Sequence, residues 1–198
     1  DLYGGHTTHL STADDDGTAG WNSKRAAMEA AFAPGTVPFS VFVESHGDWT
    51  RDRFIEHFKT PYLLIRGTPA PEVEGQIMTQ AVSKVELEEE AARVRIAPLV
   101  KRADSNSFTM MITLGRTDNN DVTLKHTMIS KFHAYFRHLG TSWTLSDAGS
   151  LNGTSIDGRK LPPERALPVR SGSRIVIGGA VAVQFLQGAD LYDAVQLG

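Results

Sequence analysis

The stretch between Leu114 and Thr154 decides the fold of this chain and contains its candidate binding residues. Its informative segments are Leu114-Gly115-Arg116, Ser130-Lys131-Phe132-His133 and Trp143-Thr144-Leu145-Ser146-Asp147-Ala148-Gly149-Ser150-Leu151-Asn152-Gly153-Thr154. Short apolar and β-branched runs alternate here with Gly, Asn and Asp, which is typical of short strands joined by tight turns. The stretch therefore predicts a β-rich unit with polar side chains at the ends of its strands.

The same alternation of short apolar runs and turn-forming residues continues on both sides of this stretch. We expect short strands at residues 108–114, 121–124, 132–138, 142–146, 154–156, 167–169, 174–177 and 181–186. Asp157-Gly158 lies between two of them and is a strong signal for a two-residue hairpin turn. Many short strands separated by turns predict a mainly β domain, built as a sandwich or a barrel.

Residues 91–187 contain this predicted domain, and composition divides the rest of the chain into three segments. We interpret residues 1–22 as an irregular acidic arm, residues 23–90 as an α/β extension of unknown role, and residues 188–198 as a short C-terminal helix. Within the extension we expect helices at 24–32, 51–58 and 72–90, and strands at 37–43 and 62–65. Leu191, Tyr192 and Val195 give the C-terminal helix an apolar face that can pack on the sandwich.

Composition limits the partners. The chain has 198 residues, no cysteine and a formal net charge of -3. It has no apolar run near the ~20 residues of a membrane helix and no secretory signal pattern, so we expect no membrane partner and a cytoplasmic location. Net charge is -8 over residues 1–90 and +5 over residues 91–198. The basic half suits an anionic ligand, but without a dense Lys/Arg block we expect no nucleic acid partner.

We also expect no metal and no cofactor. Without cysteine there is no thiolate site. His6 and His9 lie in the arm beside Asp14-Asp15-Asp16-Gly17. That acidic run does not have the alternating ligands and final Glu of a calcium loop.

Three residues near the strand ends suit a phosphate dianion, which needs donors from several directions. Arg116 follows Gly115, where a loop can approach a ligand closely, and its guanidinium can donate a charge-assisted fork. Ser130 can donate a hydroxyl, and Lys131 can add a backbone N–H and an ammonium charge. Taken singly, Arg116 is read most simply as a surface arginine and Ser130 as a turn hydroxyl, so neither residue decides the case alone.

The neighbouring residues allow more than one role. His133 can hold the Ser130 loop in shape through backbone hydrogen bonds, or pair with Ser130 as a hydrolytic couple. No nucleophile elbow or oxyanion loop surrounds Ser130, which disfavours the second reading. Asn152-Gly153 suits a tight turn, and the amide of Asn152 can also clamp the main chain of an extended peptide. Asp147 is expected to brace its own loop.

These motifs, in this order and spacing, resemble the forkhead-associated (FHA) domain family. The later stretch Val169-Arg170-Ser171-Gly172-Ser173-Arg174-Ile175-Val176-Ile177-Gly178 is similar too, so the resemblance covers roughly residues 91–187. It implies a twisted antiparallel β-sandwich that binds phosphothreonine peptides through loops at one end.

The resemblance also implies residue roles. Arg116 and Ser130 would hold the phosphate, and Lys131 stands where family members often place a second phosphate contact. Asn152 would hold the peptide backbone. Gly115, His133 and Gly153 would shape the loops.

Two positions bear on specificity. Leu151 departs from the Thr, Lys or Arg that the family often has before the Asn, which removes one polar contact. Met128 stands where side chains can meet the third residue after the phosphothreonine, and it favours an apolar residue there.

The resulting prediction is a non-enzymatic adaptor that binds a phosphothreonine-containing protein or peptide downstream of a Ser/Thr kinase. One alternative is a structural or assembly protein with a degenerate FHA domain that no longer binds phosphate. The least favoured alternative is a hydrolase that uses Ser130 and His133. Thr7 and Thr12 in the arm resemble peptides that such domains select, which suggests self-association through a phosphorylated arm.

Overall fold

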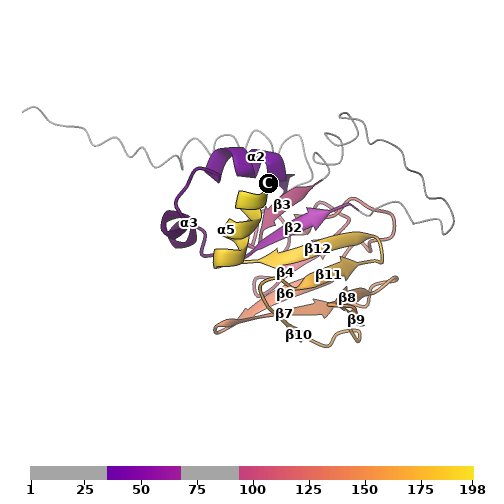
Figure 1. The fold of residues 1–198 in the computed structure, drawn as a ribbon. Helices are drawn as coiled ribbons and strands as arrows, with labels where there is room; N and C mark the ends of the chain where they lie inside the picture. Colours follow the sequence, from indigo (N-terminus) through magenta and orange to yellow (C-terminus); the bar gives the residue numbers. More distant parts are fainter. Residues whose placement is uncertain (1–34, 68–93) are drawn as a thin grey trace, which may run out of the picture.

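The computed structural model describes residues 35–67 and 94–198, which form two β-sheets with helices on one side (Figure 1). The seven-stranded sheet has the order β1-β3-β2-β12-β11-β8-β9, and the five-stranded sheet has the order β10-β7-β6-β4-β5. All strand pairs are antiparallel except β4 and β5, which run parallel. The protein is therefore mainly β, as the sequence predicted.

The elements of the seven-stranded sheet are β1 (Val37–Pro38), β3 (Arg95–Pro98), β2 (Tyr62–Arg66), β12 (Val181–Leu186), β11 (Arg174–Ile177), β8 (Thr154–Ile156) and β9 (Arg159–Lys160). Those of the five-stranded sheet are β10 (Leu167–Val169), β7 (Ser142–Asp147), β6 (Ala134–Leu139), β4 (Ile112–Gly115) and β5 (Val122–Thr123). The helices are α2 (Phe39–His46), α3 (Arg51–His57) and α5 (Gly188–Leu197).

The main core lies between the two sheets, because successive side chains of a strand point to opposite faces. Leu63 and Ile65 of β2 face inward and pack in one cluster with Leu114 of β4 and Phe136 of β6. Leu64 of β2 faces the other way and belongs to a second cluster. The seven-stranded sheet is therefore buried on both faces along β2.

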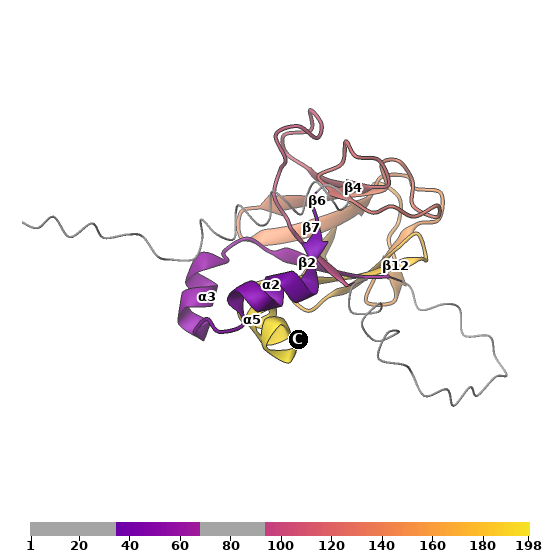
Figure 2. The same ribbon diagram turned by 90° about the horizontal axis from the view of Figure 1, so that it is seen from above.

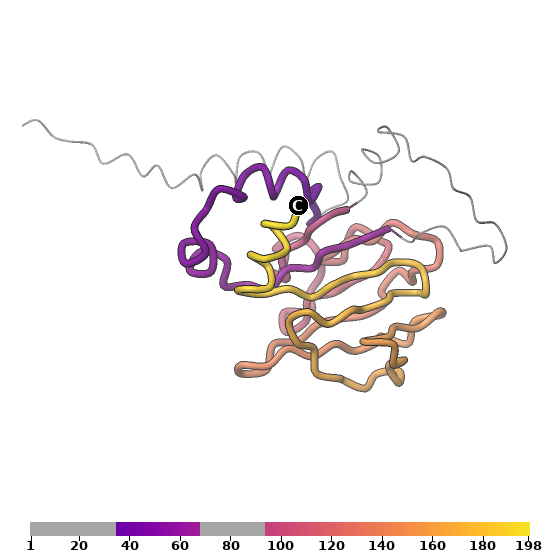
Figure 3. The backbone as a smooth tube through the Cα atoms, viewed as in Figure 1, coloured from indigo at the N-terminus to yellow at the C-terminus, as the bar shows by residue number. Residues whose placement is uncertain are grey.

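The second cluster joins the helices to the outer face of the seven-stranded sheet. Phe42 of α2, Phe54 of α3 and Leu191 of α5 pack there with Leu64 and Ile96. Seen from above, the helices lie on one side of β2 and β12, with β4, β6 and β7 on the other (Figure 2). The tube view shows α5 following directly from β12 and turning back toward α2 (Figure 3). The predicted C-terminal helix and its packing on the sandwich are confirmed.

The predicted strand at residues 37–43 is wrong. Only Val37 and Pro38 are extended, and α2 begins at Phe39. Phe39, Phe42 and His46 are buried on one face of α2, which is the spacing of a helix, so burial on this face outweighed the β-branched residues between them. The strand expected at 108–114 also starts later, at Ile112, because residues 108–111 form a turn.

The helix expected at 51–58 and the strand expected at 62–65 are confirmed by α3 and β2. β2 pairs with both β3 and β12, so sheet hydrogen bonds run across the domain boundary predicted between residues 90 and 91. The predicted hairpin at Asp157-Gly158 joins β8 to β9, and φ is +49° and +79° at its two residues. The short strand β9 itself was not predicted from the sequence.

Several predictions concern residues outside the described ranges. They are the arm at 1–22, the helix at 24–32, the helix at 72–90, and the proposed phosphorylation of Thr7 and Thr12. Within residues 35–67 and 94–198, no helix is both long and apolar enough to cross a membrane.

Candidate functional site

Three loops meet at one end of the sandwich, and backbone groups connect them. The N–H of Arg116, after β4, donates to the carbonyl of Ser130 at 3.0 Å. The N–H of Leu151, after β7, donates to Oγ of Ser130 at 3.1 Å. Nδ2 of Asn152 donates to the carbonyl of Met128 at 2.7 Å. Residues that are 14 to 36 positions apart in the sequence are thus brought side by side around Ser130.

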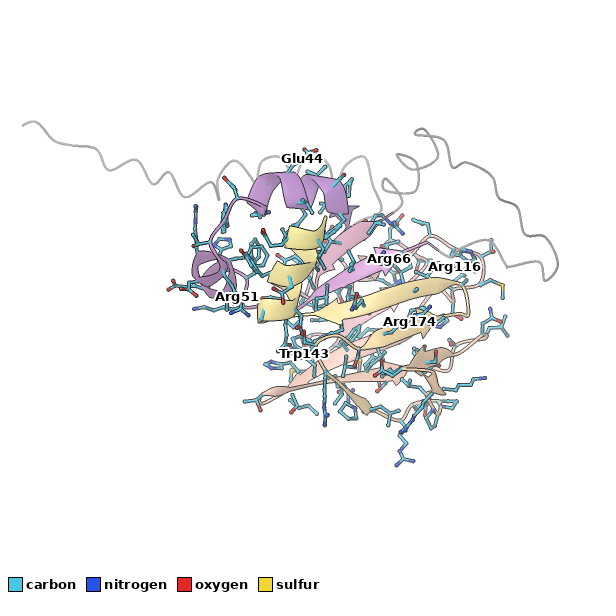
Figure 4. All side chains as sticks on the ribbon, viewed as in Figure 1. Glu44, Arg51, Arg66, Arg116, Trp143 and Arg174 are labelled. Atoms are coloured by element: carbon cyan, nitrogen blue, oxygen red, sulfur yellow. The ribbon has the colours of Figure 1, made fainter. Side chains whose placement is uncertain are left out.

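The β4–β5 loop presents the arginine. Arg116 is exposed and lies at the end of the sandwich away from α3 and α5 (Figure 4). Gly115 is buried beneath it, and a Cβ there would collide with the carbonyl of Lys131 and lie 2.7 Å from Nδ2 of Asn120. The prediction that Gly115 permits a close approach is therefore supported by the packing, and its partner is the Ser130 loop itself.

Ser130 and Lys131 present the hydroxyl and the ammonium. Oγ of Ser130 accepts the Leu151 N–H, so the hydroxyl proton stays available to an incoming acceptor. Lys131 is exposed, and its carbonyl accepts from Nδ2 of Asn120 at 2.7 Å and from Oγ1 of Thr117 at 2.9 Å. The backbone of this loop is thereby fixed while its side chains face solvent.

His133 is fully buried and connects the second loop to the third. Its Nδ1 accepts from the N–H of Ser130 at 3.0 Å, so Nε2 carries the proton and donates to the carbonyl of Gly153 at 3.1 Å. Burial lowers the pKa of the imidazole, against the opposing effects of Gly153 and Asp147, so the neutral ring is favoured. Both nitrogens are used by backbone groups, which is the loop-shaping arrangement considered from the sequence.

Asp147 braces the third loop. Its carboxylate accepts from the N–H and the Oγ of Ser150, both at 2.7 Å, and from Oγ1 of Thr154 at 2.7 Å. Burial raises the pKa of this carboxyl, but the hydrogen bonds outweigh burial and hold the pKa below its ordinary value. Ser150 Oγ in turn accepts the Gly153 N–H at 2.9 Å, and Gly153 has φ of +78°.

The surface between these loops combines one amide with two apolar side chains. Asn152 is half-buried, and one N–H of its amide contacts the Met128 carbonyl. Met128 is 45% exposed and Leu151 is 89% exposed. Leu151 therefore contributes its backbone N–H to the Ser130 loop, while its side chain stands in solvent.

Sequence reasoning missed Thr117, Asn120 and Gly178. Asn120 is buried and joins the first loop to Lys131, with Thr117 beside it. The N–H of Gly178 donates to the Gly153 carbonyl at 2.9 Å, and a Cβ on Gly178 would lie 2.6 Å from the Met128 carbonyl. Asn120 and Gly178 had only turn signals in the sequence, the pairs Asn119-Asn120 and Gly178-Gly179 between predicted strands.

Comparison with known proteins indicates a family for the part of the chain that forms the three loops. The family model of the FHA domain matches residues 112–178, the part of the chain that supplies all three loops. Residues 112–178 of the chain therefore match the FHA domain family.

Human kanadaptin is 29% identical to this chain over 93 residues, which are 41% of this chain and 12% of kanadaptin. The chain thus matches only a small part of that relative's length. Among solved structures, the FHA domain of an Arabidopsis thaliana hypothetical protein is 21% identical, covers 66% of this chain and 88% of its own, and gives a TM-score of 0.42. Mycobacterium tuberculosis EmbR, in complex with a low affinity phosphopeptide, is 17% identical, covers 65% of this chain and 25% of its own, and gives a TM-score of 0.40.

All nine residues predicted for the site lie on or directly beneath this loop surface: Gly115, Arg116, Met128, Ser130, Lys131, His133, Leu151, Asn152 and Gly153. Their roles toward a ligand remain predictions. Among the described residues, no group of three or more His, Asp or Glu side chains is placed to hold a metal ion.

Proposed function

We propose that this protein binds phosphothreonine peptides at the three-loop surface and recruits a partner phosphorylated by a Ser/Thr kinase. The single observation that supports this most is the convergence of three loops on Ser130. This convergence supports a site in which the exposed guanidinium of Arg116, the hydroxyl of Ser130 and the amide of Asn152 act on one ligand.

The phosphate part of the site follows from the chemistry of a dianion. Arg116 supplies two parallel N–H donors, which match two phosphate oxygens. Ser130 donates its hydroxyl, because its acceptor side is already used by Leu151. Lys131 adds positive charge from the same loop.

The peptide part of the site depends on Asn152. An amide offers two N–H donors and a carbonyl acceptor. One donor is used on Met128, which fixes the orientation of the side chain. Nδ2 also has a long contact of 3.9 Å with Sδ of Met128, which a peptide carbonyl can replace, and the carbonyl oxygen of Asn152 can accept from a peptide N–H.

The structure argues against the two alternative functions, a degenerate domain that does not bind phosphate and a hydrolase. A degenerate domain would lack a phosphate ligand, yet Arg116 and Lys131 are exposed and Ser130 keeps a free proton. A Ser130–His133 hydrolytic pair needs the imidazole to accept from Oγ, but both ring nitrogens are engaged by backbone groups. Binding without catalysis is therefore the better-supported function.

Calorimetry with an oriented phosphothreonine-peptide library, followed by one selected peptide, tests the proposal. Arg116→Ala should reduce affinity at least tenfold, since it removes a charge-assisted bidentate contact of about 1.5–3 kcal/mol. Arg170→Ala is the matched control, because Arg170 is exposed but lies beyond the end of β10, outside the three loops. Unchanged affinity in Arg116→Ala would show that the site is misplaced.

The same peptide with phosphoserine should bind about fourfold more weakly. The threonine methyl is worth ~0.8 kcal/mol when it is buried, and this corresponds to that ratio. Equal binding of the two peptides would argue against an apolar notch for the methyl group.

A further inference from the structure

A second cationic surface lies on the outer face of the seven-stranded sheet, beyond the helices. We define this cationic strand face by Arg66 of β2, Arg174 of β11 and Lys160 of β9, all of which are exposed. In Figure 4, Arg66 and Arg174 lie on either side of β12. We propose that it binds an acidic segment of the phosphorylated partner, an inference that rests on the function proposed above.

The strand register puts the three cations on one face. Across the sheet, Arg66 lies opposite Ala182, Ala182 opposite Val176, Val176 opposite Ser155, and Ser155 opposite Lys160. Arg174 lies two positions before Val176 and so points to the same side. The neighbouring inward positions, Ile65, Ile175 and Val183, belong to the core between the sheets.

On β12, between these cations, the outward-facing residues are the short Ala182 and the longer Gln184. Arg66 and Arg174 line one cavity of about 160 Å³ together with Ala182, Val183 and Gln184. The short side chain of Ala182 leaves room for a carboxylate to lie between the two guanidinium groups, and Gln184 can donate to it from the side. Arg66 and Gln184 also line a larger groove of about 770 Å³, where Glu44, Asp190 and Asp193 make the lining mixed in charge, so the cationic face runs from Arg66 toward Arg174 and not toward the helices.

The charge of this face is not neutralised by the described part of the protein. Within residues 35–67 and 94–198, none of the three cations forms an ion pair. Asp157, in the turn beside Arg174, accepts from the backbone N–H of Arg174 at 2.8 Å and from Oγ of Ser173 at 3.2 Å. Its oxygens are thus used to hold the turn between β8 and β9, and an acidic ligand is the complementary partner.

The face is continuous with the proposed peptide surface. Lys160 packs against Gly153, the residue after Asn152, and a Cβ on Gly153 would lie 2.8 Å from Cε of Lys160. From Ser155, Ala182 is two strands away, or about 10 Å. An extended peptide advances ~3.3 Å per residue, so it can reach from Asn152 to Arg66 in about four to eight residues.

The ligand is therefore a peptide with two separated anionic parts, a phosphothreonine and an acidic run four to eight residues away. This arrangement adds selectivity by effective concentration, because the second contact becomes intramolecular once the first has formed. The contribution of the acidic run to peptide affinity should also decrease as the ionic strength rises, because salt screens exposed charge pairs.

Calorimetry on the full chain tests this with phosphothreonine peptides that differ only in a distal tail of four Glu or four Ser, placed on either side. We expect a Glu tail on one side to raise affinity about fivefold at low salt, and the gain to shrink in high salt. The double variant Arg66→Gln, Arg174→Gln should lose the gain and keep the affinity for the Ser-tail peptide. Arg159→Gln is the control, because Arg159 adjoins Lys160 but points to the other side of β9.

Each outcome has a distinct meaning. No gain from either tail, with intact binding of the Ser-tail peptide, overturns the cationic strand face and leaves the phosphothreonine site standing. A gain that persists in the double variant also overturns it. A gain that appears only after Glu86, Glu88, Glu89 and Glu90 are changed to Gln would reassign the face to the chain's own acidic run. Failure of every phosphopeptide, with no effect of Arg116→Ala, overturns the phosphothreonine site and this inference with it.

Discussion

The backbone N–H of Leu151 donates to Oγ of Ser130 at 3.1 Å, across a separation of 21 residues. This bond makes Ser130 both a bridge between two loops and a candidate ligand. A hydroxyl has one proton, and the Leu151 contact uses only its acceptor side. The same bond thus helps to orient the third loop and leaves the hydroxyl proton free to donate to a ligand.

Ser130→Ala should therefore reduce phosphopeptide affinity more than the loss of one hydrogen bond explains. It removes a donor to the phosphate and leaves the Leu151 N–H without its acceptor, at about 1 kcal/mol for each bond. We expect a loss of roughly tenfold to thirtyfold in calorimetry, with a small decrease in stability. Ser142→Ala, an exposed serine at the start of β7, is the control. A loss below threefold would contradict the donor role.

Leu151→Lys should strengthen binding several-fold without destabilising the fold. The Leu151 side chain is 89% exposed, so its replacement removes no packing and adds a cation beside the phosphate. Leu197→Lys is a matched control, because Leu197 is 88% exposed but lies at the end of α5. Equal effects of the two variants would show that only net charge matters and that Leu151 does not face the ligand.

Gly115→Ala should destabilise the protein and disturb the site. The new Cβ would collide with the backbone carbonyl of Lys131 and press on the side-chain amide of Asn120, which is buried and held by hydrogen bonds. We expect a loss of about 1–3 kcal/mol in urea unfolding, as for other overpacked sites. Gly67→Ala is the control, because nothing lies within 4 Å of a Cβ there. A Gly115→Ala protein with native stability would mean that the two loops separate easily.

Asp147→Asn should loosen the third loop. The carboxylate accepts three hydrogen bonds, two from Ser150 and one from Thr154. In the Asp147→Asn variant an NH₂ group replaces one of the two oxygens and cannot accept, so at least one of these hydrogen bonds is lost. We expect a decrease of about 1–3 kcal/mol in unfolding free energy and a parallel loss of phosphopeptide affinity. Thermal unfolding and calorimetry on the same sample measure both. A stable variant with unchanged affinity would rule out the bracing role.

Stability should fall as pH drops below the ordinary histidine range. Burial lowers the pKa of His46 and of His133 below 6.5, so the unfolded chain binds their protons more readily than the native state. Their contribution to stability is complete above about pH 6.5 and is lost as the pH falls further. The lowered pKa values of Asp121 and Asp147 add a second loss below pH 3.8.

Urea unfolding between pH 7.5 and 5.5 measures the histidine effect. Each histidine adds at most about 1.4 kcal/mol per pH unit to the slope. His46→Phe should reduce this slope, because the aromatic cluster around His46 accepts a ring that does not titrate. The exposed His138→Phe is the control. An undiminished slope in His46→Phe would exclude His46 as a source of the effect.

The sequence pattern predicted those turns and strands whose conformation depends mainly on residues close to one another in the chain. The hairpin turn at Asp157-Gly158 was predicted from the positive φ that these residues tolerate, and it follows β8 in the structure. Alternating burial likewise marks β11 and β12 as strands. The strand prediction for residues 37–43 was wrong because it used local pattern alone. The β-branched residues there favour a strand, but packing of Phe39 and Phe42 against the sheet stabilises a helix.

The sequence by itself determined the mainly β character of the chain and its match to the FHA domain family at residues 112–178, because residue types at fixed spacing specify short strands and turns. Tertiary structure alone decided that β2 lies between β3 and β12, that His133 joins Ser130 to Gly153, and that Arg66, Arg174 and Lys160 share a face. The reason is that these contacts join residues far apart in the chain. Their register is selected by burial of whole sheet faces, which no short window of sequence contains.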